Sequence, residues 1–125
     1  MMLMPRVLVV EDDEDIRESL VDLLSEQGYE VVTAPHGADA LRLLSATPRP
    51  PCVIILDLMM PVMDGRTFRE EQLRRPELAG IPVIIISAYR DFIDSASALH
   101  LDTHLPKPIN PPELLAAVRT RCQHV

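Results

Sequence analysis

Charged and hydroxyl residues follow directly on apolar runs of the sequence, at points where they could do chemistry. In the stretch CVIILDLMMPVMDG, Asp57 stands directly against an apolar run, and Glu11 and Asp12 follow another apolar run in the same way. Ser87 ends a third run, and Lys107 lies just past a fourth. Carboxylates that gather in one place repel one another, and at neutral pH they need a cation or raised pKa values.

Together these residue types describe a site for phosphoryl transfer. Ligands that are all oxygen atoms suit Mg²⁺, a hard ion that keeps several waters in an octahedral shell. A lysine ammonium binds phosphate as a compact point charge, and a serine hydroxyl can donate to a phosphoryl oxygen. With a metal ion and Lys107 offsetting the charge, Asp57 would attack phosphorus and form an acyl phosphate. Positioning and charge neutralisation would supply most of the rate.

Short apolar runs alternate with helical patterns along the chain, which predicts βαβ units. The runs are continuously apolar, so both faces of the sheet should be covered. We therefore predict an α/β fold, a doubly wound five-stranded parallel sheet with five helices. The predicted strands are Arg6–Val10, Glu30–Ala34, Cys52–Leu56, Pro82–Ile86 and Thr103–Leu105. The first three predicted helices are Glu14–Gln27, Gly37–Ala46 and Gly65–Arg75, the last with Phe68 and Leu73 as core candidates. A fourth helix is marked by Phe92, Ala96 and Leu99. A fifth helix begins after Asn110, which caps it.

The predicted topology brings the chemically active residues together. In open parallel sheets, ligands bind outside the carboxyl ends of the strands, at a topological switch point. Four of the five predicted strands end at or just before a charged or hydroxyl residue, and only the strand that ends near Ala34 does not. The sequence therefore predicts one pocket at this edge of the sheet.

Composition narrows the class of protein. At 125 residues with 47% hydrophobic residues, the chain is long enough for one domain with a substantial core. The net charge of −7 argues against direct binding of nucleic acid, which needs a basic face. No apolar run approaches the ~20 residues of a membrane span and no signal peptide is present, so we expect a cytoplasmic protein without membrane contact. Cys52 and Cys122 form no CxxC pair, and we expect them to be buried free thiols.

Four motifs give the chain a resemblance to a known family. They are VLVVEDDEDIRESL, VIILDLMMPVMDG, PVIIISA and LPKP, and their order and spacing resemble those of the receiver domains of two-component response regulators along nearly the whole chain. The resemblance implies a flavodoxin-like fold of strand order 2-1-3-4-5. It also implies a signalling module that takes a phosphoryl group from the phosphohistidine of a histidine kinase or phosphotransfer protein. The reaction would need Mg²⁺, and it would change a surface that binds a downstream protein partner or output domain.

The resemblance also implies roles for individual residues. Asp57 would be the phosphoacceptor, Lys107 would contact the phosphoryl group, and Ser87 would be the switch hydroxyl. The peptide bond before Pro108 looks like the family's cis bond.

The same resemblance implies a set of metal ligands. Glu11 and Asp12 would form the acidic pair, with Asp12 as the more direct Mg²⁺ ligand. Asp57 and the backbone carbonyl of Met59 would complete the set.

One residue departs from the family pattern. His104 lies three residues before Lys107, where the family usually carries a tyrosine or phenylalanine ring that swings inward when the hydroxyl at the Ser87 position moves. Histidine is polar and titrates near neutral pH, so a switch through His104 would be weak or pH-sensitive. The alternative is a partly exposed strand histidine without a switch role.

The chain ends at Val125, directly after the last predicted helix. We expect residues 1–125 to be a single receiver domain without an output domain, either a stand-alone protein or a piece of a longer one. The family's usual surface for dimers and partners would be built by the helix around residues 92–99, the strand 103–105 and the last helix. That surface carries Asp102 and Arg119 but not the fuller charge pattern of the DNA-binding subgroup.

Two other functions fit less well. A phosphatase or mutase similar to the haloacid dehalogenases needs a second aspartate two residues beyond the nucleophile, where this chain has Met59. A degenerate receiver that is never phosphorylated should lack some of the active residues, and here all are present. Neither GxGxxG nor GxxxxGK[ST] occurs, which excludes the common nucleotide-binding motifs. We therefore expect no enzyme activity beyond the protein's own phosphorylation and dephosphorylation.

Overall fold

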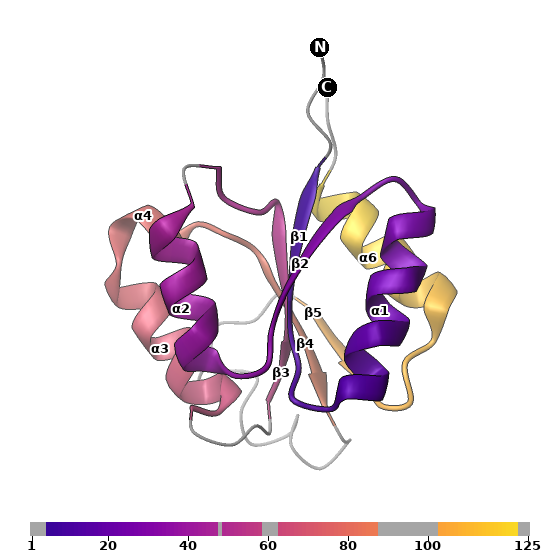
Figure 1. The fold of residues 1–125 in the computed structure, drawn as a ribbon, viewed down its shortest axis with the longest axis horizontal. Helices are drawn as coiled ribbons and strands as arrows, with labels where there is room; N and C mark the ends of the chain where they lie inside the picture. The colour runs from indigo at the N-terminus through magenta and orange to yellow at the C-terminus, as the bar shows by residue number, and fades with distance from the viewer. Residues whose placement is uncertain (1–4, 48, 59–62, 88–102, 123–125) are drawn as a thin grey trace.

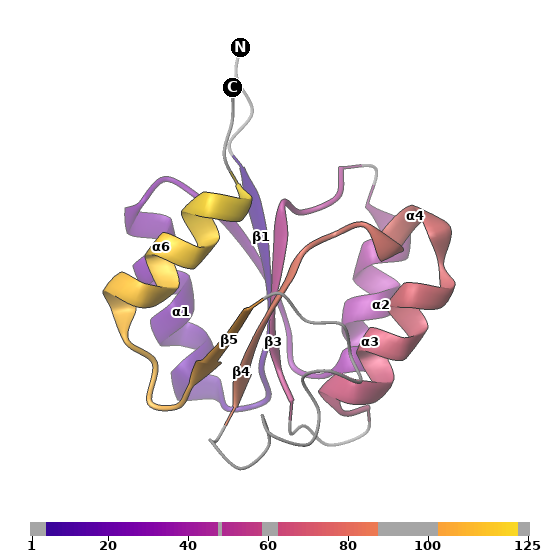
Figure 2. The same ribbon diagram turned by 180° about the vertical axis from the view of Figure 1, so that it is seen from behind.

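The computed structural model describes residues 5–47, 49–58, 63–87 and 103–122, which form a sheet between two layers of helices (Figures 1 and 2). The five strands are parallel and lie in the order β2-β1-β3-β4-β5. The strands are β1 (Arg6–Val10), β2 (Glu30–Ala34), β3 (Val53–Asp57), β4 (Val83–Ser87) and β5 (Thr103–Pro106). The helices are α1 (Glu14–Glu26), α2 (Gly37–Ala46), α3 (Gly65–Arg74), α4 (Pro76–Ala79) and α6 (Pro111–Arg121).

Both faces of the sheet are covered by helices. Figure 1 shows α1 and α6 on one face and α2, α3 and α4 on the other. Successive strand residues point to opposite faces, so Val7 and Val9 of β1 pack toward α1 and α6, while Leu8 and Val10 pack toward α2 and α3. This double burial explains why β1, β3 and β4 are almost continuous apolar runs.

The predicted fold and strand order are confirmed, and the strand boundaries differ from the predicted ranges by no more than one residue. The short helix α4, which begins at Pro76, was not predicted. The predicted helix marked by Phe92, Ala96 and Leu99 lies outside the described residues. None of the helices within the described ranges is long and apolar enough to cross a bilayer.

The prediction that Leu73 belongs to the core is wrong, because its side chain is 39% exposed. The prediction for Phe68 is confirmed, since it is fully buried, and the core position assigned to Leu73 is taken by Gln72. Gln72 is fully buried, and its amide donates to the carbonyl oxygens of Leu78 at 2.9 Å and Ile81 at 3.0 Å. Gln72, a polar residue, therefore occupies the core position that the hydrophobic pattern assigned to its neighbour Leu73.

The prediction of free thiols is also wrong. Cys52, just before β3, and Cys122, at the C-cap of α6, form a disulfide with a Cα–Cα distance of 5.2 Å across a sequence separation of 70 residues. Spacing in the sequence could not reveal the pair, because the two residues meet only when α6 packs on the sheet.

Capping side chains fix where the chain turns from the carboxyl edge of the sheet into the helices. The side chains of Asp13, Asp64 and Asn110 accept hydrogen bonds from backbone amides three residues later, at 3.1, 2.8 and 3.0 Å. Each satisfies a helix amide that would otherwise lack a partner. The predicted cap at Asn110 is confirmed, and the three caps lie in the connections that carry the candidate site.

Candidate functional site

The strand alternation brings three charged side chains to one face of the sheet. The register between β1 and β3 pairs Val10 with Leu56, so the next residues along the two chains, Glu11 and Asp57, lie side by side. The odd-numbered residues of both strands face α1 and α6, as does Leu105 of β5. Lys107 follows Leu105 by two residues and therefore continues on the same face.

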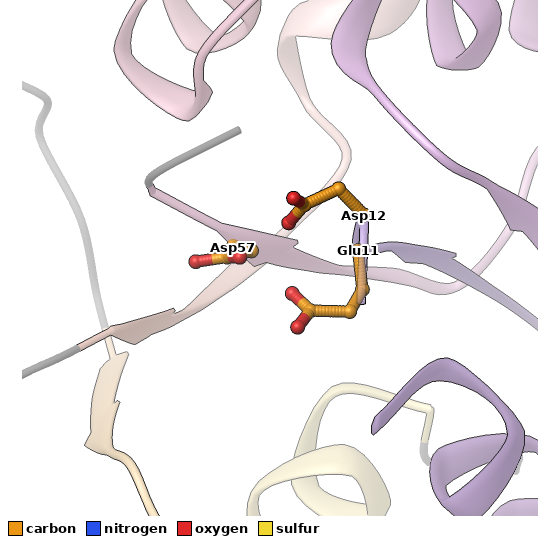
Figure 3. Close-up of side chains that lie close together, drawn as sticks. All are labelled: Glu11, Asp12 and Asp57. Carbon is orange, nitrogen blue, oxygen red and sulfur yellow. The ribbon is translucent and has the colours of Figure 1, made fainter. Parts of the chain in front are cut away.

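Three carboxylates meet at this edge. Glu11 and Asp57 are buried and Asp12 is exposed, and each offers an oxygen atom within 4.8 Å of the others. Figure 3 shows the side chains of Glu11 and Asp12 leaving adjacent residues and reaching toward the end of the strand that carries Asp57.

The ammonium group of Lys107 lies between the two buried acids. Its Nζ atom is 3.1 Å from Oε1 of Glu11 and 3.2 Å from Oδ2 of Asp57. The backbone amide of Lys107 donates to the carbonyl oxygen of Ser87 at 3.0 Å. The Lys107–Pro108 peptide bond is cis, as the resemblance implied.

The burial of like charges perturbs the acid–base behaviour of the site. The pKa of Glu11 is raised to about 8, chiefly because burial disfavours its charged form, and then because of its hydrogen bond and repulsion with Asp57; Lys107 opposes the rise. The pKa of Lys107 is raised although burial pushes it down, because the hydrogen bond to Glu11 and the charge of Asp57 stabilise the ammonium. The lysine therefore stays charged at neutral pH, while Glu11 holds a proton in the metal-free protein.

We expect the free energy of unfolding of the metal-free protein to fall as the pH rises from about 4.5 to 8. In this window the unfolded chain has lost the Glu11 proton and the folded chain still holds it, so the folded state binds more protons and raising the pH favours unfolding. The slope should approach about 1.4 kcal/mol per pH unit. Urea unfolding in a chelator across this range measures it. Glu11→Gln imitates the protonated acid, so its free energy of unfolding should change much less with pH. A slope equal to that of the unaltered protein would contradict the raised pKa of Glu11.

The donor set fits a metal ion. The second carboxylate oxygen of Glu11, Oε2, is buried and has no hydrogen-bond partner among the residues that the structure describes. A buried oxygen atom left in this state is costly unless a cation or water satisfies it. Glu11, Asp12 and Asp57 together could therefore hold a metal ion. Met59, whose carbonyl was predicted as a further ligand, lies outside the described residues.

The close approach of α3 fixes the backbone at Asp57. The amide of Gly65 donates to the carbonyl oxygen of Leu58 at 2.9 Å. A Cβ atom at Gly65 would lie 2.6 Å from the carbonyl oxygen of Asp57 and 2.7 Å from the Cα atom of Leu58. Only glycine lets the start of α3 pack this closely against the end of β3, which holds Asp57 in place.

The two predicted switch residues lie on neighbouring strands. Ser87 is buried at the end of β4, with Pro106 of β5 as its partner in the sheet. His104 of β5 is partly buried and pairs with Ile85. The structure therefore brings Glu11, Asp12, Asp57 and Lys107 together, with Ser87 on the strand beside Asp57, while His104 lies three residues back from Lys107.

Sequence reasoning missed Arg17 in the first turns of α1. Its guanidinium Nη1 donates to the carbonyl oxygen of Glu11 at 3.0 Å. The only signal in the sequence is a lone basic residue after the acidic run Glu11–Asp15, which by itself does not reveal a contact.

The carboxylates and the lysine thus lie at the carboxyl ends of the strands of a doubly wound parallel sheet, where open α/β sheets bind their ligands. The family model described as the response regulator receiver domain matches residues 7–119. The chain belongs to this family, and the resemblance of its motifs is confirmed.

Named relatives and a solved structure agree with this family. The chain is 41% identical over 116 residues to the sensor histidine kinase TmoS of Ectopseudomonas mendocina, covering 91% of this chain and 12% of TmoS. It is 43% identical over 117 residues to the transcriptional regulatory protein PrrA of Mycobacterium tuberculosis, covering 92% of this chain and 48% of PrrA. The receiver domain of a histidine kinase from Syntrophus aciditrophicus superposes with a TM-score of 0.86 at 32% identity, covering 94% of this chain and 89% of that one. The chain thus spans about half or less of these curated relatives.

Proposed function

We propose that this chain is a phosphorylation-controlled signalling domain that accepts a phosphoryl group on Asp57. The observation that carries the proposal is the ammonium of Lys107 at 3.2 Å from the buried Asp57 carboxylate, beside two further acids. The donor would be the phosphohistidine of a histidine kinase or phosphotransfer protein.

In the proposed transfer, a carboxylate oxygen of Asp57 forms a bond to phosphorus, and the phosphorus–nitrogen bond of the donor breaks. The leaving imidazole nitrogen keeps the electron pair. Lys107 offsets the charge on the phosphoryl oxygens, and the hydroxyl of Ser87 donates to one of them. Glu11, Asp12 and Asp57 would hold Mg²⁺, which when bound offsets further negative charge at the phosphoryl group.

The surface beside the site suits a protein donor. Ile16 and Leu20 of α1, together with Pro108 and Ile109, line an apolar hollow that extends to Lys107. A donor that packs an apolar helix face into this hollow would bring its phosphohistidine to the edge of the sheet where Asp57 lies.

We further propose that phosphorylation changes the surface formed by β5, α6 and the helix expected around residues 92–99. This surface would bind a downstream protein, an output domain or a second copy of the chain. His104 lies on β5 within it, and its role as the switch residue remains a prediction. The protein would act in the cytoplasm, bind no nucleic acid directly, and catalyse only its own phosphorylation and dephosphorylation.

The test is uptake of phosphate from phosphoramidate, a small donor with the same phosphorus–nitrogen bond as phosphohistidine. With Mg²⁺, the intact mass of the protein should rise by one phosphoryl group, and a chelator should prevent this. Asp57→Asn should take up none. Asp64→Asn is the matched control, because it makes the same change at an exposed helix cap where asparagine still caps well. Uptake by Asp57→Asn, or none by the unaltered protein, would refute the proposal.

A further inference from the structure

The backbone that carries the acidic pair is held by few contacts. Only Glu11, Asp12 and Asp13 connect β1 to α1. The amide of Glu11 donates to the carbonyl oxygen of Ala34 at 3.1 Å, which ties it to the end of β2. Asp13 is fixed as the cap of α1. Asp12 lies between them and is exposed.

Arg17 supplies a contact from the other side of this connection. Its guanidinium Nη1 donates at 3.0 Å to the carbonyl oxygen of Glu11, which belongs to the peptide unit that joins Glu11 to Asp12. The side chain is partly buried, and it lines a surface hollow with Val21 of α1 and Thr33 of β2. The guanidinium thus reaches back from α1 to the start of the connection.

We propose that Arg17 is a positioning residue for the metal-binding carboxylates, an inference that rests on the proposed function. The orientation of the Glu11–Asp12 peptide unit decides where both side chains point. One carboxylate goes into the buried pocket and the other to its exposed rim. Arg17 does not need to touch the metal ion or the phosphoryl group, because it acts through the backbone from which two ligands leave.

The chemistry of arginine suits this task. A guanidinium is always charged, and its planar group holds a carbonyl oxygen in a defined direction. A hydrogen bond from a charged donor is also stronger than one between neutral groups. Residues that orient metal ligands without binding the metal typically change metal affinity by about 10–100-fold when they are replaced.

The experiment measures Mg²⁺ affinity directly, by following amide NMR shifts during a titration of the full chain with MgCl₂. Arg17→Met, which keeps the length of the side chain and removes its donors, should weaken Mg²⁺ binding by about 10-fold. Arg17→Lys, which can still donate to the carbonyl oxygen, should keep most of the affinity. Arg74→Met is the matched control, because Arg74 is an exposed residue of α3 that pairs with Glu71, and it should bind Mg²⁺ as the unaltered protein does.

A second readout separates positioning from a part in the reaction itself. The rate of phosphate uptake from phosphoramidate should need more Mg²⁺ in Arg17→Met and should return to that of the unaltered protein at saturating Mg²⁺. A rate that stays low at saturation would overturn the assignment.

The remaining outcomes distinguish a failure of the proposed function from a failure of the inference about Arg17. If the unaltered protein neither binds Mg²⁺ nor takes up phosphate, the proposed function fails. If it does both and Arg17→Met matches Arg74→Met in Mg²⁺ affinity, only the inference about Arg17 fails. Should Arg17→Met not fold, Arg17→Ala, which also lacks a side-chain donor, takes its place with the same expectation. If neither folds, Arg17 is a structural residue and the inference is overturned.

Discussion

Replacing Lys107 with methionine should destabilise the metal-free protein by about 2 kcal/mol at neutral pH and slow phosphate uptake by about 100-fold. Methionine keeps most of the apolar stem and removes the ammonium, so the buried carboxylate of Asp57 loses a charged partner at 3.2 Å. Removing one member of a buried pair typically costs about 3–5 kcal/mol. The expected cost is smaller here because the lysine side chain is 27% exposed, and because Glu11 will hold its proton more firmly once Lys107 is absent.

A double-mutant cycle isolates this ion pair. Urea unfolding of Lys107→Met, Asp57→Asn and the double variant should give a coupling energy of about 1–2 kcal/mol between the two sites. Asp57→Asn alone should lower the pKa of Glu11, because the hydrogen bond to Asp57 and the charge of Asp57 both raise it. Lys107→Arg keeps the charge and should lose less stability than Lys107→Met. A coupling energy near zero would mean that the contact contributes nothing to the folded state.

The fold was predictable from the sequence because most of its strands are short apolar runs that stand out in the chain. The three central strands, β1, β3 and β4, are buried on both faces, so their apolar runs mark them with few exceptions. One error came where a polar residue is buried. Gln72 occupies a core position of α3 because its amide satisfies the carbonyl oxygens of Leu78 and Ile81. Hydrophobic periodicity cannot detect that arrangement, and it pointed to Leu73 instead.

The members of the site were predictable for a geometric reason. Parallel strands end at one edge of the sheet, so residues that follow different strands converge there whatever their separation in sequence. Lys107 meets Glu11 across 96 positions and Asp57 across 50. The contact of Arg17 with a carbonyl oxygen could not be predicted in this way, because it depends on how α1 sits beside the end of β1.

The disulfide escaped prediction because its cysteines come from elements that approach each other only in the folded chain. Cys52 precedes Val53 at the start of β3, and Cys122 ends α6. The same two segments carry Asp57 at the end of β3 and Lys107 before α6. They are therefore joined twice, by the disulfide just before the first residue of the strand and by the ion pair at its last residue.

Reduction of this disulfide should lower the free energy of unfolding by about 4 kcal/mol, the effect expected when a cross-link across some 70 residues is released in the unfolded chain. Urea unfolding with and without a reductant measures the loss. Cys52→Ala and Cys122→Ala should each resemble the reduced protein and be insensitive to reductant. Equal stability of the oxidised and reduced protein, or two titratable thiols in the folded oxidised protein, would contradict the assignment.

The same reduction should leave the site nearly unchanged. β3 rises about 3.3 Å per residue, and its five residues lie between Cys52 and the carboxyl edge of the sheet. A local rearrangement around the broken disulfide should therefore not extend to the site. Mg²⁺ affinity of the reduced, still folded protein should therefore match that of the oxidised protein. A large drop in affinity on reduction would instead mean that the disulfide holds α6, and with it Lys107, in register with Asp57.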